Sequence, residues 1–310
     1  MNRLIPEAAM KIAIGPLLFG WPEAKIREFY LSMAEESDVD ILYLGEVVCS
    51  KRSISGVEWQ LKLAAQLQES GKEVVLSTLA MPTTERELQF IRDLTAAAGE
   101  MGLTIEANDM ASVAVASRLG VEFVAGPHMN IYSHGTLQQM CRNGAKRVVL
   151  PLELPAKDIP DVVGQSDVEV EYFAHGHLPL TFSARCYTAR SHGLSKQECR
   201  HVCFLNPDGI EMHTLDDHDF ATINGTQIMS HRPFTAINHL AELAGFGVRT
   251  LRLSPQASGM PETLHHFRAA ADGLLTGDAA LNALTGGAPA HDCFCNGYYH
   301  GRQGRVWIEA

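Results

Sequence analysis

The sequence lacks any apolar run of the ~20 residues that a membrane-spanning helix needs. It also has few aromatic side chains, 7% of its residues, and too few basic ones to balance its acids, with 25 lysines and arginines against 36 acidic residues. The net charge of −11 disfavours a surface that follows the phosphates of a nucleic acid or of an anionic membrane. We therefore expect a chain that crosses no membrane and binds no nucleic acid.

Several motifs are missing as well. The short apolar stretch 10–21 has no small-residue cleavage site of a secretory signal. Neither Gly-x-Ser-x-Gly nor His-Glu-x-x-His occurs, so proteolysis is the least favoured enzymatic interpretation. The seven cysteines form no disulfide framework typical of a small secreted domain. Together these features predict a cytoplasmic protein with reduced thiols.

What the chain does have is a large apolar fraction, arranged in strands. Its 310 residues are 46% hydrophobic, enough for a full-sized core. Near-continuous apolar strands that alternate with helical stretches predict a parallel sheet covered by helices. An open doubly wound sheet is disfavoured, because no Gly-x-Gly-x-x-Gly follows the first strand. We expect a single (β/α)8 TIM-barrel-like domain over residues 1–310. The predicted strands are 11–19, 40–45, 73–79, 103–106, 122–125, 147–152, 168–173 and 248–253.

One segment interrupts this alternation. Residues 175–220 are polar and rich in His, Cys, Arg and Gly, and they are too many for a routine connection. They predict a Cys-rich, irregular insertion before the last barrel strand. Regular structure is expected to resume at 220–230 and in a helix over 233–244. An irregular C-terminal tail is predicted from about residue 276.

Three of the cysteines lie in this insertion. Cys199 and Cys203 form a Cys-x3-Cys pair, and Cys186 lies upstream of them. Cys49 directly follows the second predicted strand, at the end of a barrel strand from which functional groups project. Four thiols suit either tetrahedral zinc or an iron–sulfur cluster, and their spacing leaves both open, together with a third interpretation as inert buried thiols. The cations that could offset thiolate charge are Lys51, Arg52, Arg185, Arg190 and Arg200.

Other candidate residues each have a functional and a structural interpretation. His175 and His177 follow the seventh strand, where imidazoles could transfer protons or contact substrate, although such histidines are also common in plain loops. Glu46 could orient a ligand loop or act as an acid or base, but a carboxylate near a strand end often caps a helix or forms a salt bridge. Arg185 and Arg190 could bind an acidic substrate or balance a thiolate cluster.

The remaining cysteines and histidines carry weaker signals. Cys293 and Cys295 form a Cys-x-Cys that could be a second metal or redox site, although ordinary thiols of the tail are the better interpretation. Cys141 is typical of a small buried hydrophobic residue. We assign no chemical role to the adjacent histidines His265 and His266.

Several stretches resemble the collagenase-like peptidase family. They are 42–52, 75–79, 176–180, 183–186, the Cys-x3-Cys pair, 252–256 and 295–298. The resemblance covers most of the chain. Within the family, the chain most resembles the proteins that act in ubiquinone biosynthesis. This resemblance implies a 4Fe-4S protein whose cluster ligands are Cys49, Cys186, Cys199 and Cys203.

The same resemblance implies an activity and partners. It points to the oxygen-independent hydroxylation steps of ubiquinone biosynthesis, carried out in a heterodimer with a homologous subunit. The ubiquinone precursor would reach the heterodimer either through an apolar entrance at the barrel mouth or from a lipid-binding protein that delivers it, and the sequence leaves both routes open. Two alternatives stay open: an RNA-base hydroxylase, which other relatives exemplify, and a non-catalytic iron–sulfur scaffold whose partner holds the active site.

Overall fold

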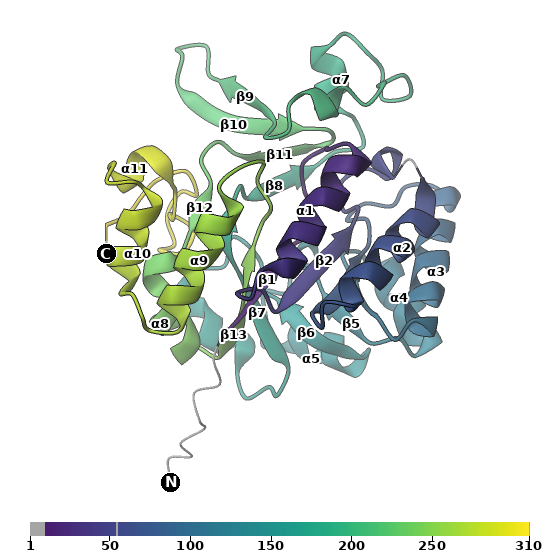
Figure 1. Ribbon diagram of the computed structural model, residues 1–310, viewed down its shortest axis with the longest axis horizontal. Coiled ribbons are helices and arrows are strands. Elements are labelled where there is room, and N and C mark those ends of the chain that lie inside the picture. Colours follow the sequence, from purple (N-terminus) through teal and green to yellow (C-terminus); the bar gives the residue numbers. More distant parts are fainter. Residues whose placement is uncertain (1–9, 54, 310) are drawn as a thin grey trace.

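The computed structural model describes residues 10–53 and 55–309, and eight parallel strands in it close into a barrel. Around the barrel the strands follow the chain, and the last strand pairs with both the first and the seventh. The (β/α)8 prediction is therefore confirmed (Figure 1). The barrel strands are β1 (Lys11–Ile14), β2 (Ile41–Gly45), β3 (Glu73–Ser77), β4 (Thr104–Ala107), β5 (Phe123–Ala125), β6 (Ala145–Val149), β7 (Glu169–Gly176) and β13 (Val248–Leu253).

Helices cover the outside of the barrel, and local sequence sets their ends. Helix α3 begins at a capping box, in which the Thr84 side chain accepts from the Glu87 backbone amide and Glu87 bonds back to Thr84. Gly120 ends α4 in the left-handed conformation, at φ 67°. The covering helices are α1 (Glu23–Glu35), α2 (Gly56–Gln68), α3 (Glu85–Glu100), α4 (Met110–Leu119), α5 (His134–Arg142), α6 (Ile159–Val163), α8 (Leu240–Gly245) and α9 (Met260–Ala271). No helix in the described ranges is both long and apolar enough to span a membrane.

The insertion between β7 and β13 forms a small antiparallel sheet in the order β8-β11-β10-β9. Figure 1 shows this sheet above one end of the barrel, with α7 beside it. The segment is thus less irregular than expected, and its strands continue to Ser230. Strand β9 alternates half-buried and exposed side chains and has no fully buried one, so its apolar signal is weak in a polar segment. Its elements are β8 (Pro179–Phe182), α7 (Tyr187–Ser191), η4 (Val202–Leu205), β9 (Ile210–His213), β10 (Asp219–Asn224) and β11 (Gln227–Ser230).

Three local predictions were wrong. The first strand ends at Ile14, and the apolar residues 17–21 instead pack with Met229 beneath the inserted sheet. The predicted helix over 233–244 begins with β12 (Phe234–Thr235), which pairs with β7, and its helical part starts only at η5 (Ile237–His239). The tail beyond 276 contains α10 (Gly277–Leu284) and α11 (Ala290–Cys293), the first capped by the Thr276 side chain.

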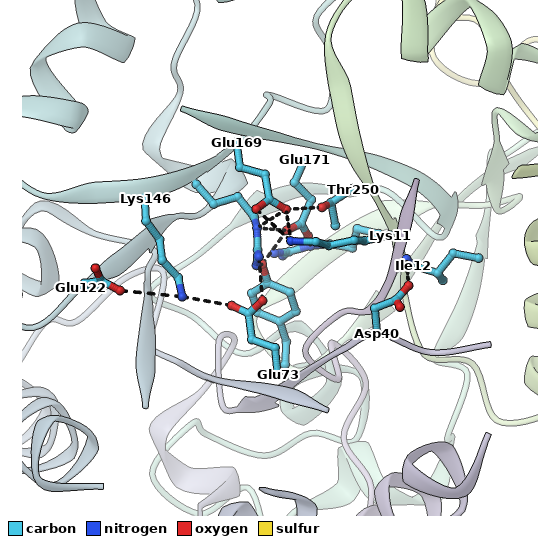
Figure 2. A network of polar contacts seen from close by, with 12 residues as sticks. Lys11, Ile12, Asp40, Glu73, Glu122, Lys146, Glu169, Glu171 and Thr250 are labelled. Carbon is cyan, nitrogen blue, oxygen red and sulfur yellow. Dashed lines mark hydrogen bonds and ion pairs between the residues drawn. The ribbon is translucent and has the colours of Figure 1, made fainter. Parts of the chain in front are cut away.

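Charged side chains fill much of the barrel interior. Arg252 lies between two buried carboxylates, with Nη1 2.6 Å from Glu106 Oε1 and Nε 2.5 Å from Glu171 Oε1. The Tyr43 hydroxyl donates to Glu171 Oε2, and Arg147 pairs with Glu73. Figure 2 shows Glu73, Glu169 and Glu171 converging in this network. Because a buried charge without a partner is strongly destabilising, each of these side chains depends on its partners inside the closed barrel.

Candidate functional site

Cys49 lies on a tight loop between β2 and η1 (Ser50–Arg52), here called the Cys49 loop (46–53). Glu46 shapes it, because its Oε1 accepts hydrogen bonds from the backbone amides of Val48 and Cys49, at 2.8 and 2.9 Å. Burial raises the pKa of Glu46, and Arg52 and these two amides oppose the rise. The structure thus places Glu46 in a loop-orienting position beside Cys49.

The other three thiols lie on the insertion. The Cys186 sulfur caps α7 by accepting from the Ala189 backbone amide at 3.4 Å. Cys199 and Cys203 flank a turn in which Arg200 and His201 have φ values of 49° and 55°. Non-glycine residues adopt this left-handed conformation at a cost of about 1–3 kcal/mol, and such strain gathers at functional sites. The turn keeps both thiols on one short loop, here called the Cys199 loop (196–203).

Hydrogen bonds tie the Cys199 loop to the Cys49 loop. The Lys51 ammonium donates to the Gln197 carbonyl at 2.9 Å, and a His201 ring nitrogen lies 2.8 Å from the Lys51 carbonyl. Nearby, the Thr226 hydroxyl at the β10–β11 turn donates to the Val48 carbonyl at 2.9 Å. The fold therefore brings the Cys199 loop, which carries two of the insertion thiols, against the Cys49 loop.

Arg52 is the buried cation at the centre of these loops, with 5% of its surface exposed. Its guanidinium donates to the Leu18 carbonyl at 2.9 Å and to the Asn224 carbonyl at 3.0 Å. The Asn224 side-chain amide in turn donates to the Cys203 carbonyl at 3.2 Å. Arg52 thus joins the segment after β1, the Cys49 loop and the inserted sheet.

The charge of the Arg52 guanidinium also influences the pKa of two thiols, Cys49 and Cys203. Burial raises the pKa of Cys49 and of Cys203, and the Arg52 charge opposes that rise at both. Space around Cys203 is tight, since a Cβ on Gly20 would lie 3.0 Å from its sulfur. A buried positive charge beside two thiols favours anionic sulfur, the form that binds metals.

The thiol-bearing loops lie side by side but, among the described residues, their side chains do not form a preformed metal site. Within residues 10–53 and 55–309, no three His, Cys, Asp or Glu side chains are grouped so that they could hold one metal ion. Cys203 is buried, and Cys49, Cys186 and Cys199 are half-buried. The donor chemistry, four thiols with a buried cation, nevertheless suits iron–sulfur or zinc binding.

The two candidate histidines, His175 and His177, have different surroundings. His175 is 3% exposed and packs edge-on against Phe267 of α9 and Phe294, and burial lowers its pKa to about 3. His177 has a ring nitrogen 2.8 Å from the Ser230 carbonyl, and burial lowers its pKa too. Both imidazoles are therefore neutral near pH 7, and His175 belongs to the packing between barrel and helix.

Cys295 is also a core residue. Burial raises its pKa to about 12, and its residue forms a bridge with Phe234 of β12. Cys293 and Cys141 are half-buried, and Arg185 and Arg190 are exposed on the insertion. The structure gives Cys295 the environment of an unreactive thiol.

Sequence reasoning missed a group of polar residues at the barrel mouth. Arg252 Nη2, Asn108 Oδ1 and Ser254 Oγ are buried and have no hydrogen-bond partner among the described residues. All three residues line a cavity of about 10 Å³, which is close to the volume that one water needs. Asn108 and Ser254 directly follow β4 and β13, so their position at the carboxyl ends of barrel strands was the signal that could have found them.

The fold and site together define a TIM-barrel protein with a thiol-bearing insertion over the mouth of the barrel. The family model described as Peptidase family U32 matches residues 30–309. The chain belongs to this family.

Individual similarities are more distant. The chain is 24% identical over 257 residues to a protein named collagenase from Porphyromonas gingivalis (strain ATCC BAA-308 / W83), covering 76% of this chain and 60% of the relative. The chain therefore spans about 60% of that protein's length. Among solved structures, it is similar to the U32 peptidase Mk0906, with a TM-score of 0.44, 10% identity and coverage of 83% and 98%. Dihydropteroate synthase from Thermus thermophilus also has a TM-score of 0.44, with 15% identity and coverage of 88% and 96%.

Proposed function

We propose that this chain is the iron–sulfur component of the oxygen-independent hydroxylation steps of ubiquinone biosynthesis, the role of the protein UbiV, working with the homologous subunit UbiU. The observation that carries the proposal is the meeting of thiol-bearing loops at one buried cation. Arg52 connects the Cys49 loop to the inserted sheet and acts on two thiols. Membership of the family is the second support.

In this proposal Cys49, Cys186, Cys199 and Cys203 hold a 4Fe-4S cluster, which supplies one-electron chemistry when bound. Glu46 holds the Cys49 loop through two backbone amides. The Lys51–Gln197 hydrogen bond keeps the loop that carries Cys199 against it. These contacts support the proposal because they hold the Cys49 loop and the Cys199 loop against one another.

The unpartnered groups at the barrel mouth have room for one water molecule. A water in the cavity of about 10 Å³ could donate to Asn108 Oδ1 and accept from Arg252 Nη2, both of which lack partners among the described residues. Catalytic groups of TIM barrels lie at this end of the strands.

An anaerobic complementation experiment tests the function. A bacterial strain that lacks this chain but retains its partner subunit should make ubiquinone without oxygen only when the wild-type chain is supplied. Cys186→Ala should lower the ubiquinone content, measured by mass spectrometry, by at least about tenfold, because a ligand is lost. Cys141→Ala, a half-buried cysteine on α5, is the matched control and should keep the wild-type content. Equal ubiquinone content in the Cys186 and Cys141 variants would contradict the proposal.

A further inference from the structure

A hollow of about 1020 Å³ lies between the Cys49 loop, the start of α3 and the Cys199 loop. Cys199 lines it, and so do Leu79 and Phe90 at its apolar part. Four cations surround it, here called the basic rim: Lys51, Arg86, Lys196 and Arg200. Lys51, Arg86 and Arg200 are exposed, and Lys196 is half-buried.

The cations of the basic rim form no ion pairs within the part of the chain that the structure describes. Among the described residues, none of the four lies within 4.0 Å of a carboxylate, whereas other surface cations such as Lys62 do pair. The Lys51 ammonium contacts the Gln197 carbonyl, and the Lys196 ammonium contacts the Ala184 carbonyl at 3.2 Å. The charges of the rim are therefore available to a molecule outside the chain.

The acids beside the hollow are mostly engaged elsewhere. Glu46 accepts two backbone amides, and Glu87 accepts from Ser50, Thr83 and Thr84. Burial raises the pKa of Glu87, but those hydrogen bonds outweigh it and hold the pKa at about 2. Glu198 is the remaining acid that lines the hollow, and it is exposed.

The part of the insertion that borders the hollow is positively charged, whereas the chain as a whole is negatively charged. Residues 183–207 contain four lysines and arginines and one acid, within a chain of net charge −11. Arg52 supplies the buried charge beside the thiols, and of the rim cations Lys196 also opposes the rise of the Cys49 pKa. A positive patch on an acidic protein attracts acidic partners and orients them as they approach.

We propose that the basic rim binds an acidic one-electron carrier protein, such as an acidic ferredoxin, beside Cys199. The proposal rests on the proposed function, because it assigns the carrier to the thiol site. With a cluster bound by the thiols, the carrier would exchange one electron with it, so that one would be oxidised as the other is reduced and no atom would be transferred. The concave hollow receives an acidic protrusion of the carrier, and the rim pairs with its carboxylates.

Binding of an acidic 2Fe-2S ferredoxin to the full-length, anaerobically purified chain tests the proposal. Isothermal titration calorimetry should show binding at low ionic strength that weakens at least tenfold between about 0.05 M and about 0.5 M salt, where the screening length falls severalfold. The double variant R86E and K196E should weaken binding by a further factor of about ten or more. Both positions are exposed or half-buried and neither is a proposed ligand.

Arg118→Glu is the matched control, because Arg118 is an exposed arginine in the last turn of α4, away from the hollow. Its ferredoxin affinity should stay within about twofold of the wild type. Equal affinity in the rim variant and the control would overturn the proposal, as would tighter binding of single-stranded RNA than of ferredoxin at the rim. Iron analysis of the same preparations separates the two ideas: an iron-free wild-type chain contradicts the proposed function, whereas the titration alone decides the docking surface.

Discussion

Replacing Arg252 with methionine is expected to lower the free energy of unfolding by about 3–5 kcal/mol, the usual cost of removing one partner of a buried ion pair. Glu106 and Glu171 would both lose the guanidinium that lies 2.5–2.6 Å from them, inside a closed barrel. Urea denaturation followed by circular dichroism measures the change. The loss is a large part of the 5–15 kcal/mol that stabilises a typical domain.

Arg249→Met is the control on the same strand. Arg249 is half-buried, and its guanidinium donates to backbone carbonyls of Ala244 and Val248. Its loss should cost about 1 kcal/mol. A triple variant in which Arg252→Met is combined with Glu106→Gln and Glu171→Gln should recover part of the stability, because no unpaired charge remains buried. An Arg252 variant as stable as the Arg249 variant would show that the interior pairs do not hold the barrel.

Replacing Arg52 with methionine should have the second largest effect, about 2–4 kcal/mol in the free energy of unfolding. The change leaves the carbonyls of Leu18 and Asn224 without a donor and removes the charge shared by Cys49 and Cys203. The Cys199 loop should also detach more often, so limited trypsin digestion within 183–203 should become faster.

Arg185→Met provides the comparison, because Arg185 is exposed and adjacent to Cys186. Its unfolding free energy should stay within about 0.5 kcal/mol of the wild type, and trypsin should cut the rest of the insertion at the wild-type rate. If the Arg52 and Arg185 variants behaved alike in both measurements, Arg52 would have no role in joining the loops.

The barrel could be predicted from the sequence because each buried parallel strand is apolar enough to stand out between helices. Its interior could not. Arg147, Glu171 and Arg252 sit inside strands, and a sequence does not say whether such a side chain faces the helices or the barrel axis. Two of their ion pairs cross the barrel, Arg252 of β13 with Glu106 of β4 and Arg147 of β6 with Glu73 of β3, and these strands face one another only when the barrel closes.

The cysteine site also depends on long-range contacts that the sequence does not reveal. Spacing and position after β2 indicated which thiols to group, but Arg52 was one cation among several. Its contacts reach Leu18 and Asn224, 34 and 172 residues away, and these long-range contacts distinguish it from Arg185. Regular structure over 220–230 was predicted and corresponds to β10 and β11, whereas β9 was missed because its residues are at most half-buried.

The central claim is that the four cysteines hold an iron–sulfur cluster, and metal analysis tests it most directly. Iron, sulfide and zinc should be measured with the visible absorbance of the chain purified without oxygen, alongside Cys49→Ala. The account predicts close to four irons and four sulfides per chain, lost in the variant, as a 4Fe-4S cluster requires. Stoichiometric zinc without sulfide, or iron that persists unchanged in Cys49→Ala, would contradict it.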